Sequence, residues 1–172
     1  MPLFPLTGRE RRFGDDELIV SKTDATGKIR YANSVFLRVA EYREDEVLGQ
    51  PHSIVRHPDM PRCIFKLLWD TVKAGQEIFA YVVNRSKLGD HYWVFAHVTP
   101  NLGPDRRILG YHSSRRSPNR EALVAVQQLY SQLLAEEKRH GDPKVGLAAS
   151  FAMLGDILSG KGVEYDQFVH SL

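Results

Sequence analysis

Hydrophobic side chains change their spacing along this chain, and the changes predict a domain built from both strands and helices. Short apolar runs at 18–20 and 28–32 flank the turn-forming residues 24–27, a pattern typical of a β-hairpin. Asn33 then stands where a helix N-cap is expected. Across 64–73, apolar residues recur every three to four positions, which indicates a helix with one buried face. A hairpin followed by helices is therefore predicted for this part of the chain.

After residue 77 the spacing of apolar side chains shortens to two, which predicts consecutive antiparallel strands. These three runs cover residues 78–85, 90–100 and 106–115. Together with the hairpin they would form one antiparallel sheet with helices across one face, an α+β arrangement. A cupped sheet under helices also forms a natural pocket.

Helical spacing returns after residue 119 and predicts two amphipathic helices, one from 120 to a break at 140–143 and one from 144 to 158. Their apolar stripes can pack back on the domain or build a dimer bundle, and the pattern does not choose between these two arrangements. The predicted parts are an N-terminal extension (1–17), a central domain (18–118) and a C-terminal helical segment for signalling or dimerisation (119–172).

Composition limits the partners that this chain can have. Its 172 residues, 42% hydrophobic and 26% charged, suit one medium globular domain with an appendage. The formal net charge is +2 and basic residues are interleaved with acidic ones, so nucleic acid is not an expected partner. The single Cys63 allows no intrachain disulfide, which fits a reducing cytoplasm. The apolar run 145–155 is shorter than the roughly 20 residues of a membrane-spanning helix, so direct membrane insertion is not expected.

The loop 50–61 concentrates polar chemistry on a stiff backbone, because three prolines restrict it. It carries His52, Arg56, His57 and Asp59, whose side chains can recognise an anion, a heteroaromatic edge or a metal. The alternative is a loop in which these groups bond only to one another, as polar loop residues often do. The loop is a candidate ligand site.

Three further side chains qualify as ligand contacts. Asn84 offers an amide that both donates and accepts hydrogen bonds, although it could equally bond its own loop. Phe65 and Trp69 lie one helical turn apart and could stack on a flat ligand, although aromatic pairs at this spacing are often core. The sequence has no nucleophile–base arrangement, glycine-rich phosphate loop or metal-spaced set of ligands, so neither catalytic turnover nor a metal centre is expected.

Four stretches of the chain resemble the PAS domain of bacterial aerotaxis (energy-taxis) receptors. They are the segments 33–36, 46–52, 56–61 and 84–94. The resemblance covers 18–116 and implies a PAS fold with a five-stranded antiparallel sheet, to which the C-terminal helices are added. It also implies noncovalently bound FAD whose redox state is reported to a chemotaxis-type signalling module. Members of this family normally continue into a membrane anchor and a signalling domain, neither of which this sequence shows. The expected partner is therefore a separate membrane-bound transducer or another signalling protein.

The resemblance and the side-chain chemistry together nominate a set of cofactor contacts. The candidates are Asn33, His52, Arg56, His57, Asp59, Phe65, Trp69 and Asn84. At three positions the chain departs from the family, which commonly has tryptophan, glycine and a basic residue where this chain has Ile78, Ala80 and Val83. These departures bear on flavin affinity and redox tuning, because polarity around a flavin sets its potential.

Two other functions compatible with a PAS fold compete with the flavin hypothesis. PAS pockets also hold haem, and His52, His57 or another histidine could serve as an axial ligand in a gas sensor. Alternatively, side chains could fill the pocket, leaving a cofactor-free interaction module whose function resides in the C-terminal helices.

Overall fold

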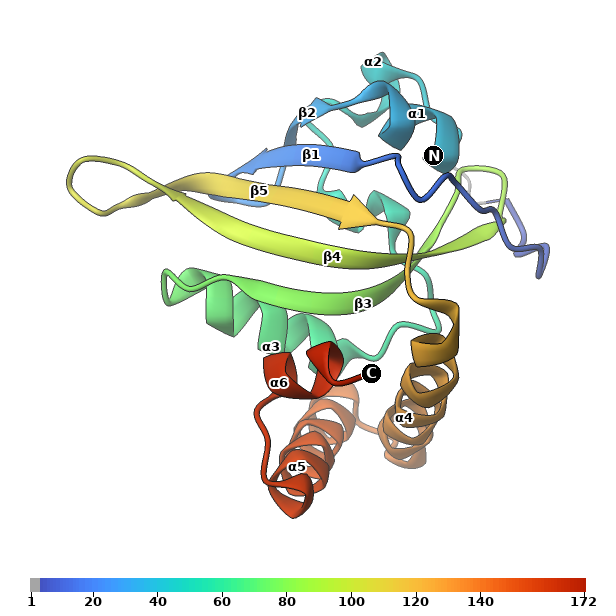
Figure 1. Ribbon diagram of the computed structural model, residues 1–172, viewed down its shortest axis with the longest axis vertical. Coiled ribbons are helices and arrows are strands. Elements are labelled where there is room, and N and C mark those ends of the chain that lie inside the picture. The colour runs from blue at the N-terminus through green and yellow to red at the C-terminus, as the bar shows by residue number, and fades with distance from the viewer. Residues whose placement is uncertain (1–3) are drawn as a thin grey trace.

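Five antiparallel strands form a single sheet in the order β2-β1-β5-β4-β3 (Figure 1). The strands are β1 (Ile19–Asp24), β2 (Ile29–Ala32), β3 (Ile78–Arg85), β4 (His91–Leu102) and β5 (Ile108–Arg116). The computed structural model describes residues 4–172, so the first three residues of the predicted extension lie outside the described part. The predicted five-stranded α+β architecture is confirmed, while β1 and β4 extend beyond their predicted ends.

Asp24 fixes the turn between β1 and β2. Its Oδ1 accepts hydrogen bonds from the backbone N–H of Thr26 (2.9 Å) and Lys28 (3.1 Å) and from the Thr26 hydroxyl (2.6 Å). Gly27 supplies the positive φ of 84° that this turn requires and that other residues adopt at a cost. These contacts hold the carboxylate in its charged form and lower the pKa of Asp24.

Short helices and one longer helix cover one side of the sheet, here called the inner face. They are α1 (Ser34–Ala40), α2 (Glu44–Val47), the 3-10 helix η1 (His52–Val55) and α3 (Arg62–Lys73). Asn33 caps α1 as predicted, because its Oδ1 accepts from the N–H of Phe36 at 2.9 Å. The same side chain bonds the β1 end of the sheet, accepting from the N–H of Val20 (3.0 Å) and donating to the carbonyl of Leu18 (2.8 Å). Asn33 therefore ties the first helix to the sheet.

The strict alternation of β3 and β4 separates residues of the inner face from those of the outer face. Neighbours pair across the two strands as Val82 with Val94 and Asn84 with Tyr92 on the inner face. One residue further along, Val83 pairs with Trp93 on the outer face. Because successive side chains of a strand point to opposite sides, a single step in sequence changes the side of the sheet.

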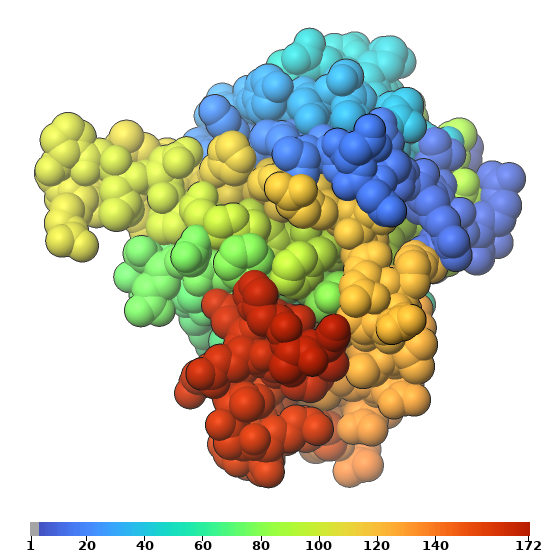
Figure 2. Space-filling model, in the orientation of Figure 1, coloured from blue at the N-terminus to red at the C-terminus, as the bar shows by residue number. Residues whose placement is uncertain are grey.

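The C-terminal segment folds back on the rest of the chain. It contains α4 (Arg120–Arg139), α5 (Pro143–Lys161) and α6 (Tyr165–His170), and α5 packs on α3 while α6 packs on β3. Figure 2 shows these helices as a lobe beside β3, away from β1 and β2. The helix α6 was not predicted, because it is only six residues long. A homodimer through these helices remains a prediction.

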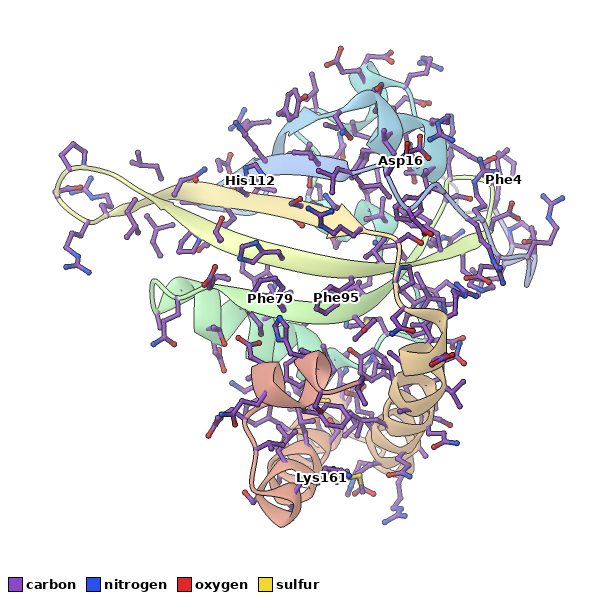
Figure 3. The ribbon with its side chains drawn as sticks, viewed as in Figure 1. Phe4, Asp16, Phe79, Phe95, His112 and Lys161 are labelled. Carbon is purple, nitrogen blue, oxygen red and sulfur yellow. The ribbon has the colours of Figure 1, made fainter. Side chains whose placement is uncertain are left out.

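Aromatic side chains anchor the C-terminal helices to the outer face. The hydroxyl of Tyr130 on α4 donates to the carbonyl of Tyr81 at 2.6 Å and lies 2.9 Å from the hydroxyl of Tyr165. His170 of α6 packs edge-on against Phe79 with ring centroids 4.6 Å apart. Figure 3 labels Phe79 and its neighbour Phe95 on this face of the sheet. Helices therefore cover both faces near β3, not only the one face that the periodicity predicted.

Candidate functional site

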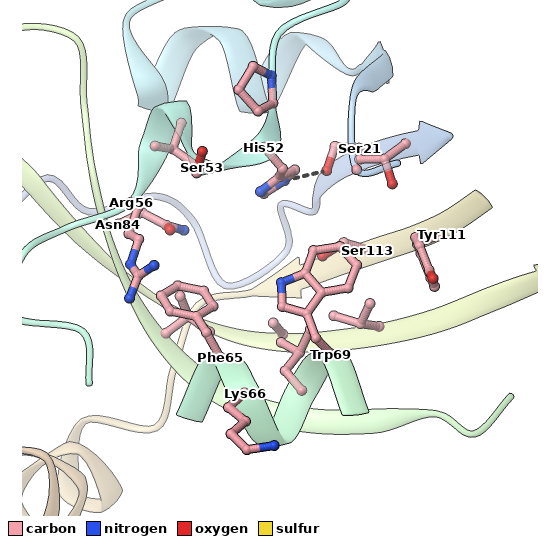
Figure 4. A pocket seen from close by; sticks show the side chains of 18 of the residues that line it. Ser21, His52, Ser53, Arg56, Phe65, Lys66, Trp69, Asn84, Tyr111 and Ser113 are labelled. Carbon is pink, nitrogen blue, oxygen red and sulfur yellow. Dashed lines mark hydrogen bonds between the residues drawn. The ribbon is translucent and has the colours of Figure 1, made fainter. Parts of the chain in front are cut away.

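A cavity of about 500 Å³ lies between the inner face of the sheet, η1 and α3. This inner cavity has the size of a small-molecule site. Its floor comes from alternate residues of the strands, and its other walls from α3 and from the segment around η1 that follows α2 (Figure 4). The residues of the floor are Ser21, Thr23, Val82, Asn84, Ala96, Val98, Tyr111, Ser113 and Arg115.

Arg115 is the most unusual group in the inner cavity, because it is only 2% exposed and lies close to no acid. Among residues 4–172, no carboxylate oxygen lies within 4.0 Å of its guanidinium. The guanidinium donates to the hydroxyl of Ser21 and lies 3.4 Å from Nε2 of His52, but its Nε has no hydrogen-bond partner in this part of the chain. Burial lowers the pKa of Arg115 to about 10, so the side chain remains charged at neutral pH. A buried cation without a counterion is a site for an electron-rich or anionic group.

His52 complements this cation as a neutral imidazole. Burial, assisted by the nearby charge of Arg115, lowers the pKa of His52 to about 3. Because Arg115 can only donate, Nε2 of His52 acts as the acceptor and the ring proton resides on Nδ1. The Ser21 hydroxyl lies 3.0 Å from the same Nε2 and can donate to it while accepting from Arg115. These three residues form a connected polar end of the inner cavity.

Asn84 presents a free amide to the same cavity. The residue is 4% exposed, and its side chain has no hydrogen-bond partner among residues 4–172. Its backbone forms an isolated bridge with Arg56, which fixes the polar loop against the end of β3. A buried amide without a protein partner is ready to pair with a ligand that both donates and accepts.

Aromatic side chains of α3 form the opposite wall. Figure 4 shows Phe65 and Trp69 across the inner cavity from His52 and Ser21. Trp69 packs edge-on against Tyr111 with ring centroids 5.2 Å apart, and the guanidinium of Arg56 lies 4.3 Å from the centroid of the Phe65 ring. The wall is flat and apolar, which suits a planar ring system.

Five of the eight predicted contacts line the inner cavity, and three do not. His52, Arg56, Phe65, Trp69 and Asn84 surround it. Asn33, in contrast, uses its side-chain amide to cap α1 and to bond the backbone of Leu18 and Val20 at the start of β1.

His57 and Asp59 line a different cavity, of about 640 Å³, on the outer face beside Val83 and Trp93. In this outer cavity, Nδ1 of His57 accepts a hydrogen bond from the backbone N–H of Asp59 at 3.1 Å. The local bonding that the sequence left open as an alternative is therefore present in this half of the loop. Burial lowers the pKa of His57, so neutral imidazole is favoured. Arg56 therefore lines the inner cavity, whereas the next residue, His57, lines the outer cavity on the opposite face of the sheet.

The polar groups that β1 and β5 contribute to the inner cavity were not predicted from the sequence. Ser113 and Arg115 are alternate residues of β5, and Ser21 pairs with Ser113 across the two strands. The period of two in β5 assigns Tyr111, Ser113 and Arg115 to one face, but it does not say which face is buried. The pairing of β1 with β5, more than 80 residues away, supplies that information. Of the three positions that depart from the aerotaxis pattern, Ile78 and Ala80 are buried in the core, and Val83 lines the outer cavity.

Comparison with known protein families and sequences agrees with this geometry. A family model described as PAS fold matches residues 29–115. The aerotaxis receptor of Escherichia coli is 41% identical over 130 residues, which are 76% of this chain and 26% of the receptor. The nitrogen fixation regulatory protein of Klebsiella pneumoniae is 30% identical over 97 residues, 56% of this chain and 20% of the regulator. The chain thus spans about a quarter and a fifth of the lengths of these two relatives.

Solved structures share the same fold at lower sequence identity. The dark structure of the blue-light photoreceptor Aureochrome1 LOV aligns with a TM-score of 0.56 and 20% identity, covering 69% of this chain and 86% of that one. A light-oxygen-voltage domain from a study of a flavin analogue aligns with a TM-score of 0.55 and 18% identity, covering 67% of this chain and 86% of that one. With the family match across half of its length, the chain belongs to the PAS fold family.

Proposed function

We propose that this protein is a PAS sensor that binds FAD in the inner cavity and reports its redox state to a signalling partner. The partner would be a membrane-bound chemotaxis-type transducer or another signalling protein, and the sensor would act in the cytoplasm without catalytic turnover. The 41% identity to an aerotaxis receptor supports the redox input, and the flavin analogue studied in a domain of the same fold supports the cofactor class. Among residues 4–172, no helix combines the length and apolar character that crossing a membrane requires.

The observation that carries this proposal is that the charged Arg115 and the free amide of Asn84 both line one largely apolar cavity. The isoalloxazine ring has carbonyl and imide groups along one edge and an apolar surface elsewhere. Asn84 can donate to a carbonyl and accept from an imide N–H, while Arg115 can donate to electron-rich ring atoms. Trp69 and Phe65 offer the flat wall that such a ring needs. The residues present therefore fit a flavin.

The polar end of the inner cavity also offers a route for the signal. A bound flavin supplies a ring that gains electron density when it is reduced. Arg115 would then be drawn more strongly toward the ring, which would weaken its hydrogen bonds with Ser21 and His52. Ser21 belongs to β1 and Arg115 to β5, so this change acts on the contact between two neighbouring strands. Such a shift in hydrogen bonding can favour a different arrangement of the sheet.

The region 18–118 would sense and the region 119–172 would transmit, either directly or as a homodimer. The position of the inner cavity and the packing of α5 on α3, which forms a wall of that cavity, support this proposed division.

The geometry speaks against haem ligation by His52. Its Nε2 lies 3.0 Å from the Ser21 hydroxyl and 3.4 Å from a charged guanidinium. An axial ligand needs a free ring nitrogen, and a cation beside it would oppose binding of a ferric centre.

The absorption spectrum of the purified protein tests the proposal. We expect flavin bands, and we expect chromatography of the heat-released chromophore to identify FAD. A Soret band without flavin bands would favour the haem sensor. Colourless protein that takes up no FAD on reconstitution would favour the cofactor-free module.

A further inference from the structure

One side of the inner cavity, here called its mouth, lies between α3 and α5, the second helix of the C-terminal hairpin of α4 and α5. Arg62 and Lys66 of α3 lie along this mouth, and Leu147 of α5 closes it from the side of the hairpin. Arg56 approaches from the polar loop, next to Phe65 (Figure 4). The C-terminal hairpin is thus part of the wall of the cavity as well as a neighbour of α3.

Glu137 near the end of α4 joins the hairpin to the start of α3. Its carboxylate, 8% exposed, accepts from the backbone N–H of Cys63 at 3.0 Å and from the hydroxyl of Ser150 at 3.0 Å. It also accepts from Nε of Arg62 at 3.4 Å. Pro61 has no side-chain group to cap α3, so Glu137 supplies the missing acceptor from another element. Arg62 donates further to the carbonyl of Pro143, the first residue of α5.

The charges at the mouth leave a cationic excess. Lys66 is paired with Asp70 at 2.5 Å, and Arg62 is paired with Glu137. The guanidinium of Arg56 has neither a hydrogen bond nor a carboxylate within 4.0 Å among residues 4–172. Three cations thus face two carboxylates, and Arg62 is held in place by the hairpin.

We propose that Arg56 and Arg62 form an anion subsite at this mouth, which the C-terminal hairpin completes through Glu137 and Leu147. The ligand group would be the phosphates of a dinucleotide flavin, an inference that rests on the proposed function. Arginine suits this role because its planar donors match phosphate oxygens. Glu137 is a positioning residue that fixes Arg62.

Occupancy of the subsite would also stabilise the docked hairpin. Anything that binds only the docked arrangement shifts the equilibrium toward it, and the coupling is reciprocal. The phosphate-bearing arm would touch Arg62, which bonds Glu137 of α4 and the carbonyl of Pro143 of α5. The hairpin would therefore distinguish FAD from riboflavin, which lacks the phosphates.

Binding of FAD and riboflavin to the full chain tests the subsite. We expect Arg62→Gln to weaken FAD binding about tenfold, as loss of a charge-assisted hydrogen bond does. Riboflavin affinity should change less than about twofold, because riboflavin does not reach the mouth. The matched control is Arg107→Gln in the exposed turn between β4 and β5, which should leave both affinities unchanged.

Three outcomes separate the claims. If neither flavin binds the wild-type protein, the proposed function itself fails. If both bind but Arg62→Gln changes FAD and riboflavin affinity equally, or changes neither, the subsite is wrong while the flavin site stands. Glu137→Gln should reduce the preference for FAD over riboflavin, and an unchanged or increased preference would show that Arg62 needs no support from the hairpin.

Hydrogen–deuterium exchange of the wild-type protein provides a test that needs no variant. We expect FAD to slow exchange in α5 (Pro143–Lys161) more than riboflavin does at equal saturation of the site. Equal protection of α5 by the two flavins would overturn the link between the subsite and the hairpin.

Discussion

The two cavities on opposite faces of β3 differ in how their polar groups are satisfied. In the inner cavity, Arg115 and Asn84 are nearly fully buried; within residues 4–172, Nε of Arg115 and the amide of Asn84 have no hydrogen-bond partner. In the outer cavity, His57 bonds the backbone of Asp59, whose side chain is 69% exposed. Buried groups without partners are costly, so a fold that keeps them gains something elsewhere. The contrast supports the inner cavity as the proposed ligand site, whereas the polar loop residues at the outer cavity bond one another.

Replacing Arg115 should have the largest effect on this contrast. Arg115→Met is expected to weaken flavin binding about 100-fold, or roughly 2–3 kcal/mol, because a charge-assisted contact is lost. The apo protein should melt at the same or a higher temperature, since a buried charge without a counterion is removed. The matched control is Arg116→Met, one residue along β5 and exposed, which should alter neither property. Fluorescence titration measures the flavin affinity, and thermal melts measure the stability. An Arg115→Met protein that binds flavin as tightly as the wild type would show that the buried charge of Arg115 does not serve the ligand.

Asn84 should have the next largest effect. Asn84→Ala is expected to weaken flavin binding about tenfold, close to 1.4 kcal/mol, because the amide has no partner among residues 4–172 and is proposed to bond the flavin. Asn101→Ala, at the exposed end of β4, is the control and should bind as the wild type does. Unchanged binding in Asn84→Ala would mean that the free amide faces no ligand.

Tyr130 tests whether the outer face contributes to stability and not to binding. Tyr130→Phe removes a buried hydroxyl that bonds the Tyr81 carbonyl and lies 2.9 Å from the Tyr165 hydroxyl. We expect the free energy of unfolding to fall by about 1–2 kcal/mol, while flavin affinity remains within about twofold. Tyr31→Phe, on an exposed ring, should change neither quantity. Denaturant melts measure the stability, and flavin titration measures the affinity. A Tyr130→Phe protein that binds flavin more weakly while its free energy of unfolding is unchanged would contradict this assignment.

Asp59 should have the smallest effect. Asp59→Asn retains the backbone N–H that bonds His57, so flavin affinity should change less than about twofold. The resemblance to aerotaxis receptors implies a cofactor role for this residue, so the same titration decides between the two interpretations. A tenfold loss of affinity would place Asp59 at the flavin despite its position on the outer face.

The regular elements were predictable where an apolar period is long and uninterrupted. The strand Ile78–Arg85 has its predicted ends, and α4 begins at Arg120 as predicted, because alternation and helical spacing are clear there. The short α6 was not predictable in this way, since its six residues depend on the packing of Tyr165 and Phe168 against the rest of the chain.

The candidate site was only partly predictable, for a geometric reason. Arg56 and His57 are adjacent in a loop without a period, so the sequence cannot show that they serve opposite faces of the sheet. Arg115 escaped notice because its importance depends on Ser21 and His52, which long-range strand pairing and the packing of η1 bring to it. Whether a buried arginine has an acidic neighbour depends on contacts between distant parts of the chain, so the local sequence pattern does not show it.

The most direct test of the central claim is a crystal structure of the protein with FAD. We predict an isoalloxazine ring in the inner cavity, within hydrogen-bonding distance of the Arg115 guanidinium and the Asn84 amide, and packed against Trp69. A flavin found in the outer cavity against His57, or one in the inner cavity that touches neither Arg115 nor Asn84, would contradict the account.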